Sequence, residues 1–255
     1  MACNLINKKI TKQLILYFIL LALWQILVSL KIWPQYLLPS PAKVCATLAE
    51  GFKNHTFLIG IMISFKRLLI GFGISIFCGA ALGVFLLKYK IIDEALSGLI
   101  LGLQTLPSIC WFPLAIIWFN LSEWAIIFVI IAGSLFSITM ATSTAFKNVP
   151  PIYIKAGRNM GARGVTLLRK VIIPAAIPSL LIGLRQSWSF AWRSLMAGEL
   201  LFNSLGLGYL LYMGRELNDM SMVLAVMLVI AAISITIDRW IFGELEAKIR
   251  LKYGL

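Results

Sequence analysis

Arg185, Ser189 and Arg193 follow one another at intervals of four residues within an apolar stretch, which predicts that they share one face of a helix. A charge inside a membrane segment is costly unless it faces a cavity or a partner. Guanidinium groups bind oxyanions through charge-assisted hydrogen bonds. The spacing predicts the wall of a passage for a small anion. In the alternative interpretation, Arg185 extends to the membrane surface and Arg193 pairs with an acid such as Glu199.

Tryptophans and prolines accompany these charges. Trp188 and Trp192 are predicted to form a stripe beside the arginine face, and Pro107 and Trp111 interrupt another apolar stretch. Proline breaks the helical hydrogen-bond ladder, which favours a structural kink over a gate. The candidate residues of a translocation path are Pro107, Trp111, Arg185, Trp188, Ser189, Trp192, Arg193 and Glu199.

The elements that must position these residues are membrane-spanning helices. The chain has 255 residues, of which 60% are hydrophobic and 13% charged, with a mean hydropathy of +0.93. A soluble domain is nearer half apolar and a quarter charged. Since backbone in lipid must satisfy its own hydrogen bonds, we predict an all-α polytopic membrane protein. The six predicted spans are 13–30, 58–87, 96–119, 124–145, 176–201 and 222–242.

The net charge of +13 is explained by membrane orientation and predicts no nucleic-acid partner. With the N-terminus in the cytoplasm, fourteen basic residues lie inside: Lys8, Lys9, Lys12, Lys88, Lys90, Lys147, Lys155, Arg158, Arg163, Arg169, Lys170, Lys248, Arg250 and Lys252. Four lie outside: Lys31, Lys43, Lys53 and Arg215. This asymmetry predicts that both termini are cytoplasmic in a bacterial plasma membrane.

The predicted organisation is one membrane domain. Residues 1–12 form a cytoplasmic N-terminus, and 13–30 form a retained first span, because no signal-peptide cleavage pattern follows it. An outer linker, 31–57, contains a short helix that Ser40 is expected to cap, with Pro41 at its first position. The permease core covers 58–245, and 246–255 form a cytoplasmic C-terminus.

Neither catalysis nor metal binding is indicated by the sequence. The cysteines are scattered, no CxxC pair occurs, and His55 is the only histidine. No nucleophile with a nearby base, and no carboxylate and histidine cluster, suggests a membrane enzyme. The phosphate-binding pattern GxxxxGK[ST] is absent, so we expect no catalytic residues, no metal and no cofactor in this chain.

A basic loop, residues 146–175, is too apolar for a flexible linker. Its hydrophobic residues recur at helical spacing, and Gly157, Gly161 and Gly164 interrupt them. We predict two short amphipathic helices separated by a glycine break. Such a helix either inserts into a groove on a soluble partner or lies on lipid headgroups, and spacing alone favours neither.

The loop resembles the EAA loop of binding-protein-dependent ABC importer permeases. The residues Lys155-Ala156-Gly157 are followed after three residues by Gly161, and after nine more by Val171-Ile172-Ile173-Pro174. The remaining chain is similar to the nitrate, sulfonate, taurine and bicarbonate branch, through segments such as 37–41, 106–107, 183–185, 197–200 and 206–209. Lys155 stands where the family usually has an acidic residue, and Gly157 stands where it has alanine.

The resemblance implies a type I importer permease that works as a dimer, most simply a homodimer. A cytoplasmic ABC ATPase dimer, which carries ATP and Mg²⁺, would dock on the loop, and an extracytoplasmic solute-binding protein would deliver a small anion. The ATPase-coupling residues carried over are Lys155, Ala156, Gly157, Arg158, Gly161 and Pro174. The other partner is membrane lipid. An ion-gradient-driven secondary transporter is the alternative, but such proteins more often show inverted repeats and mid-membrane acids.

Overall fold

The computed structural model describes residues 2–34 and 36–253, and every regular element within them is helical, as predicted. The first half of the chain contains α1 (Ala2–Ser29), α2 (Pro41–Lys53), α3 (Thr56–Lys88), α4 (Lys90–Thr105), the 3₁₀ turn η1 (Ser108–Trp111), α5 (Phe112–Phe119) and α6 (Glu123–Lys147). The second half contains α7 (Pro151–Asn159), α8 (Gly164–Leu167), the π-helical η2 (Leu168–Ile172), α9 (Ile173–Phe202), α10 (Leu207–Glu216), α11 (Met220–Ile237), the π-helical η3 (Asp238–Gly243) and α12 (Glu244–Tyr253).

Four helical stretches in the described residues are long and apolar enough to cross a membrane: Thr56–Lys88, Glu123–Lys147, Gly164–Phe202 and Met220–Ile249. A shorter apolar helix, Ile15–Ser29, covers the predicted first span. The predicted span 96–119 is broken into α4 and η1–α5, which are bent by 101° relative to each other, at the position where the sequence predicts a proline kink. Leu106 has an extended backbone, as expected for a residue that precedes proline, here Pro107.

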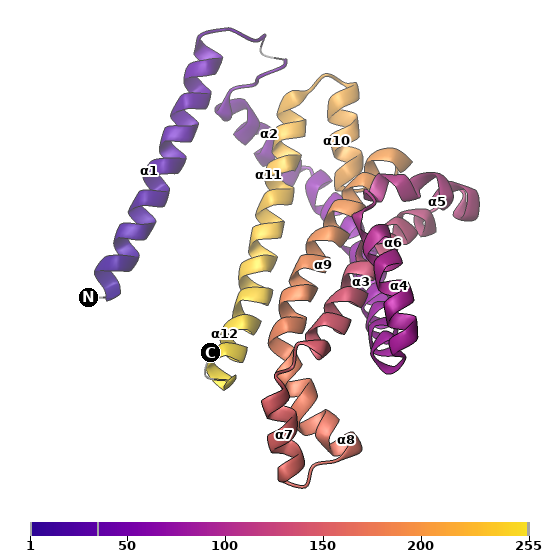
Figure 1. The fold of residues 1–255 in the computed structure, drawn as a ribbon. Coiled ribbons are helices and arrows are strands. Elements are labelled where there is room, and N and C mark those ends of the chain that lie inside the picture. The colour runs from indigo at the N-terminus through magenta and orange to yellow at the C-terminus, as the bar shows by residue number, and fades with distance from the viewer. Residues whose placement is uncertain (1, 35, 254–255) are drawn as a thin grey trace.

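Helix α6 is the centre of the bundle and packs most extensively against α3 and α9 (Figure 1). Glycines allow this close approach. A Cβ atom added at Gly79 of α3 would lie 2.9 Å from the carbonyl oxygen of Leu135 in α6. Buried serines then bond across the interfaces: Ser134 Oγ donates to Ser75 Oγ at 2.9 Å. Small residues and hydroxyl pairs are the usual means of packing helices in lipid.

Helix α1 stands apart from the other helices in Figure 1, and among the described residues its main packing contact is with α2. The indole N–H of Trp24 donates to the carbonyl oxygen of Pro39 at 3.1 Å. Ser40 caps α2 as predicted, since its side chain accepts from the backbone N–H of Lys43 at 3.3 Å, with Pro41 at the first helical position. Helix α1 begins at Ala2, so it includes the residues that were assigned to a separate N-terminus.

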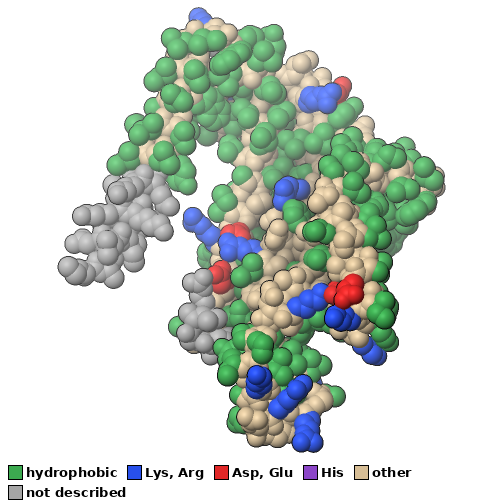
Figure 2. Space-filling view, viewed as in Figure 1, with side chains coloured by type: hydrophobic (Ala, Val, Ile, Leu, Met, Phe, Trp, Pro, Cys, Tyr) green, Lys and Arg blue, Asp and Glu red, His purple; other side chains and the backbone are tan. Residues whose placement is uncertain are grey.

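The basic loop contains the two predicted helices, α7 and α8, which lie at one end of the bundle (Figure 1). Lys and Arg side chains are prominent over this end in Figure 2. The chain passes from α8 through η2 into α9 without leaving the helical state. The loop is therefore attached directly to the helix that carries the arginine face.

Candidate coupling and translocation site

Gly161 ends α7 in the left-handed conformation, with φ of +81°. The N–H of Gly161 donates to the carbonyl oxygen of Arg158 at 3.0 Å, and the N–H of Ala162 donates to that of Gly157 at 2.9 Å. These two bonds form a Schellman motif, which favours glycine because it has no Cβ atom. A Cβ atom at Gly161 would meet nothing within 4 Å, so the constraint is conformational rather than steric.

Gly157 has a different role, because it is buried where α7 lies against the start of the following helix. A Cβ atom at this position would come within 2.8 Å of Val171 Cγ2 and 2.9 Å of Leu167 Cδ1. An alanine here would require the side chains of Leu167 and Val171 to shift, or α7 to move away from them. The glycine thus allows α7 to lie close to α8 and η2.

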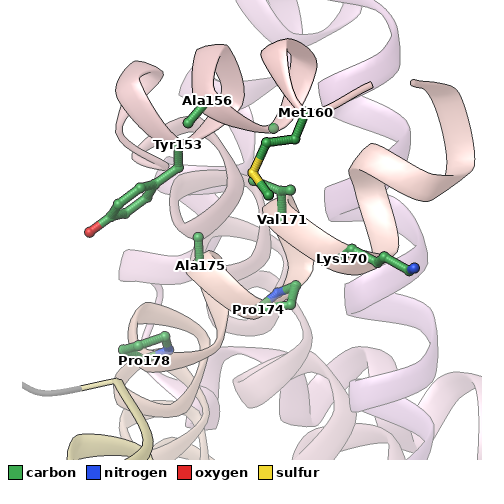
Figure 3. A pocket seen from close by; sticks show the side chains of 9 residues that line it. Tyr153, Ala156, Met160, Lys170, Val171, Pro174, Ala175 and Pro178 are labelled. Carbon is green, nitrogen blue, oxygen red and sulfur yellow. The ribbon is translucent and has the colours of Figure 1, made fainter. Parts of the chain in front are cut away.

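A groove of about 420 Å³ lies between α7 and the start of α9 (Figure 3). The side chain of Met160 reaches toward Val171 in this view, while the amino group of Lys170 points away from the groove. Its lining is mostly apolar: Tyr153, Ala156, Gly157, Met160, Lys170, Val171, Pro174, Ala175 and Pro178.

The predicted coupling residues are brought together by this arrangement. Lys155, Ala156 and Arg158 lie on the exposed surface of α7. Pro174 is half-buried and lines the groove where α9 begins. Lys155 has no ion-pair partner among the described residues, so its ammonium group is available to another molecule.

Arg185 is held by acids that the sequence did not assign to it. Its guanidinium donates from Nε and Nη2 to the two carboxylate oxygens of Asp238, and from Nη1 to Glu246 Oε2 at 3.3 Å. The side chain is 42% exposed. A bidentate pair of this kind fixes geometry as well as charge, and it connects α9 with η3 and α12. Arg185 therefore links helices in this structure, a contact that the sequence did not predict, and its place on the translocation path stays a prediction.

Trp188 and Trp192 contribute to the core as well as to a cavity. Their rings are stacked, with centroids 6.4 Å apart. Trp188 meets Phe72 edge-on at 5.2 Å, and Trp192 meets Phe65 at 6.0 Å. The predicted aromatic stripe is thus packed between α9 and α3, with part of each ring facing open space.

Arg193 lies between two cavities. One, of about 590 Å³, is bounded by α9, α11 and η3, and Ser189 also lines it. The other, of about 210 Å³, lies at the break after α4 and is lined by Pro107 and Gln104. The Oε1 atom of Gln104 is buried without a hydrogen-bond partner, and sequence reasoning did not single out this residue.

Trp111 supports the break rather than lining these two cavities. Its ring stacks on Phe136 with centroids 5.9 Å apart. The hydroxyl of Ser108 accepts from Ser194 Oγ at 2.8 Å, which ties η1 to α9. The Pro107 kink is therefore held against the helix that carries Arg193.

Glu199 was predicted to line the path, but it is fully buried in a polar network. Ser64 Oγ lies 2.9 and 2.8 Å from the two carboxylate oxygens, and Arg67 Nη1 donates to Oε1 at 3.1 Å. Arg67 also donates from Nη2 to Glu123 at 3.0 Å. The carboxylate accepts hydrogen bonds from α3 and from the turn after α9, and it does not face an open path. Arg193 does not pair with it.

The turn between α9 and α10 closes over this carboxylate. The N–H of Gly208 donates to Glu199 Oε2 at 2.9 Å. A Cβ atom at Gly206 would lie 2.4 Å from the carboxylate, and one at Gly208 would lie 2.5 Å from Glu199 Cβ. Gly206 and Gly208 are required in this turn because the backbone passes so close to a buried charge. The signal that could have identified the partner is Arg67 itself, a charge within a predicted span.

A bundle of apolar helices with one broken span and a projecting basic loop defines a polytopic membrane transport protein. The chain belongs to the family described as the binding-protein-dependent transport system inner membrane component, whose model matches residues 71–243. It is therefore a permease subunit of the ATP-binding-cassette importer type, rather than an ion-gradient-driven transporter.

The relatives agree with this assignment. A putative ABC transporter permease protein of Methanocaldococcus jannaschii is 34% identical over 238 residues, which cover 90% of this chain and 89% of the relative. A putative aliphatic sulfonates transport permease protein of Bacillus subtilis is 27% identical over 230 residues, covering 90% and 83%. A chain of the inward-facing MetNI methionine ABC transporter has the same fold, with a TM-score of 0.65 and 17% identity, covering 76% of this chain and 96% of the other.

Proposed function

We propose that two copies of this chain form the pathway of an importer for a small anionic solute of the sulfonate, nitrate, taurine or bicarbonate class. A cytoplasmic ATPase dimer docks on the basic loop, and an extracytoplasmic binding protein delivers the solute to the opposite face. ATP and Mg²⁺ bind the ATPase, and this chain holds no cofactor. The sulfonate permease relative supports the substrate class.

The observation that carries this proposal is the construction of the basic loop. Met160 is 87% exposed and Ile152 is 67% exposed, next to the basic side chains of α7. Exposed apolar side chains beside unpaired positive charges form a surface that is suited to insertion into a groove on a partner protein. Because α8, η2 and α9 are continuous from Gly164 to Phe202, movement of the docked loop is transmitted directly to α9.

The basic loop is assigned to the cytoplasmic side. The fourteen-to-four distribution of basic residues supports this orientation. In Figure 1 the start of α1 and the end of α12 lie toward the same side of the bundle as α7 and α8. In this proposal both termini lie in the cytoplasm, and α10 lies at the outer face.

Replacing Gly161 with valine should leave the protein inserted but reduce ATP hydrolysis stimulated by the binding protein about tenfold. A non-glycine residue in the left-handed region costs about 1–2 kcal/mol, and each 1.4 kcal/mol is a factor of ten in the docked population. The measurement is ATPase activity of the reconstituted complex, together with recovery of the ATPase on the purified permease.

Gly161→Asn is the matched control, because asparagine tolerates the left-handed conformation. It should retain most of the stimulated activity. Equal activity of the valine and asparagine variants, at equal ATPase recovery, would show that the Schellman motif has no part in docking. Solute uptake by the permease without any ATPase would contradict the proposed function itself.

A further inference from the structure

The cavity of about 590 Å³ between α9 and the α11–η3 segment combines positive charge with hydroxyl and aromatic groups. Arg193 of α9 and Arg239 of η3 each contribute a guanidinium group to its lining. The π-helical form of η3 is itself unusual, and such turns occur frequently at functional sites. The full lining is Trp188, Ser189, Trp192, Arg193, Ser234, Ile235, Asp238 and Arg239.

The charges around this cavity do not balance. Asp238 is the single acidic residue of the lining, and both its oxygens accept from Arg185, which lies outside the lining. Glu246 of α12 faces Arg185 as well. Within the described residues, neither Arg193 nor Arg239 lies within 4 Å of a carboxylate. The cavity thus has two arginines that no carboxylate of the described residues neutralises by direct contact.

Arg193 keeps several donors available. Its Nε donates to the carbonyl oxygen of Ser189 at 3.2 Å, and its guanidinium lies 4.8 Å from the centroid of the Phe190 ring. The residue is nine positions from the end of α9 at Phe202, or about 14 Å along the axis. An unpaired charge at this depth in a membrane segment indicates a functional site.

Trp192 packs in the wall of the cavity without exposing its donor. The residue is 6% exposed, and its indole Nε1 is buried and has no hydrogen-bond acceptor. The donors that a ligand in the cavity could reach are therefore those of the two arginines and the serine hydroxyls. Guanidinium groups bind oxyanions through charge-assisted hydrogen bonds.

We propose that this cavity is a transient binding site for a small sulfonate-type oxyanion on its way through the permease. The arginines and the Ser189 and Ser234 hydroxyls bind the charged head, and the tryptophan rings contact the short apolar part. The inference rests on the proposed transport function and specifies where in this chain the solute is held. It also makes Arg239 a specificity residue, which sequence analysis did not select.

The test uses the complete transporter complex in phosphatidylcholine nanodiscs, with trifluoromethanesulfonate as the probe and its ¹⁹F linewidth as the readout. We expect saturable broadening that methanesulfonate reverses. Arg193→Gln and Arg239→Gln should each weaken binding at least tenfold, whereas Arg193→Lys should be intermediate. Arg215→Gln is the matched control, because Arg215 is exposed at the far end of the bundle in α10.

If both glutamine variants bind the probe as tightly as the parent protein does, the proposal is overturned. Competition by phosphatidylglycerol but not by methanesulfonate would also overturn it, since the site would then hold a lipid headgroup. Because binding is measured without ATP, the result of the binding test does not depend on whether the complex transports solute. A complex that couples ATP hydrolysis to solute but does not bind the probe contradicts only this site, and one that binds without coupling contradicts only the proposed function.

Discussion

Arg67→Met should destabilise the detergent-solubilised permease by about 3–5 kcal/mol, the range measured when one partner of a buried ion pair is removed. Arg67 is 3% exposed and Glu199 is fully buried, so the variant leaves a carboxylate in the core without its cation. The Ser204 hydroxyl and the carbonyl oxygen of Leu205 lose their donor at the same time. The measurement is unfolding in a denaturing-detergent titration.

The double variant Arg67→Met/Glu199→Leu should recover a large part of this loss, since replacing both partners with apolar residues leaves no isolated charge. Lys66→Met provides the surface control. Lys66 is 66% exposed and only 3.8 Å from Glu123, so its loss should change stability by less than about 1 kcal/mol. If Arg67→Met and Lys66→Met destabilise the protein equally, the buried network does not hold α3 to α9.

Gly79→Leu should prevent α3 and α6 from packing and abolish recovery of folded, monodisperse protein. The added Cβ atom alone would lie 2.9 Å from both Ile138 Cβ and the Leu135 carbonyl oxygen, and a backbone atom cannot turn aside as a side chain can. Overpacking a tight interface usually costs about 1–3 kcal/mol or more. Size-exclusion chromatography of the membrane extract measures the effect.

Gly73→Leu on the same helix is the matched control. Gly73 is exposed and a Cβ atom there would meet nothing within 4 Å, so this face accepts an apolar side chain. The two variants have the same change in helix propensity and hydrophobicity. If Gly73→Leu is as damaging as Gly79→Leu, the effect comes from the loss of glycine and not from the α3–α6 contact.

Local signals in the sequence were sufficient for much of the fold. Apolar length identified the four helical stretches that are long enough to cross a membrane, and Ser40 with Pro41 identified the start of α2. The glycine break of the basic loop followed from the position of Gly161, because a left-handed helix end is a property of a few consecutive residues. Such features depend on neighbours in the chain and need no tertiary contact.

The pairing of the charged residues could not be obtained in this way. Arg67 and Glu199 are 132 positions apart, and Arg185 and Asp238 are 53 apart. Helical spacing shows which residues share a face of one helix, but it does not show which other helix that face packs against. Glu199 was therefore assigned to the path although it is buried, and the sharpness of the bend after Thr105 depends on packing against α6 and α9.

The isolation of α1 has a consequence for membrane orientation. A helix in lipid satisfies its own backbone hydrogen bonds, so α1 does not require the rest of the bundle to be stable there. Lys8, Lys9 and Lys12 precede its apolar stretch, and positive charges beside an apolar helix bias its orientation in the membrane. An element that makes few contacts with the bundle among the described residues thus carries its own orientation signal, independent of the helices that carry the arginines.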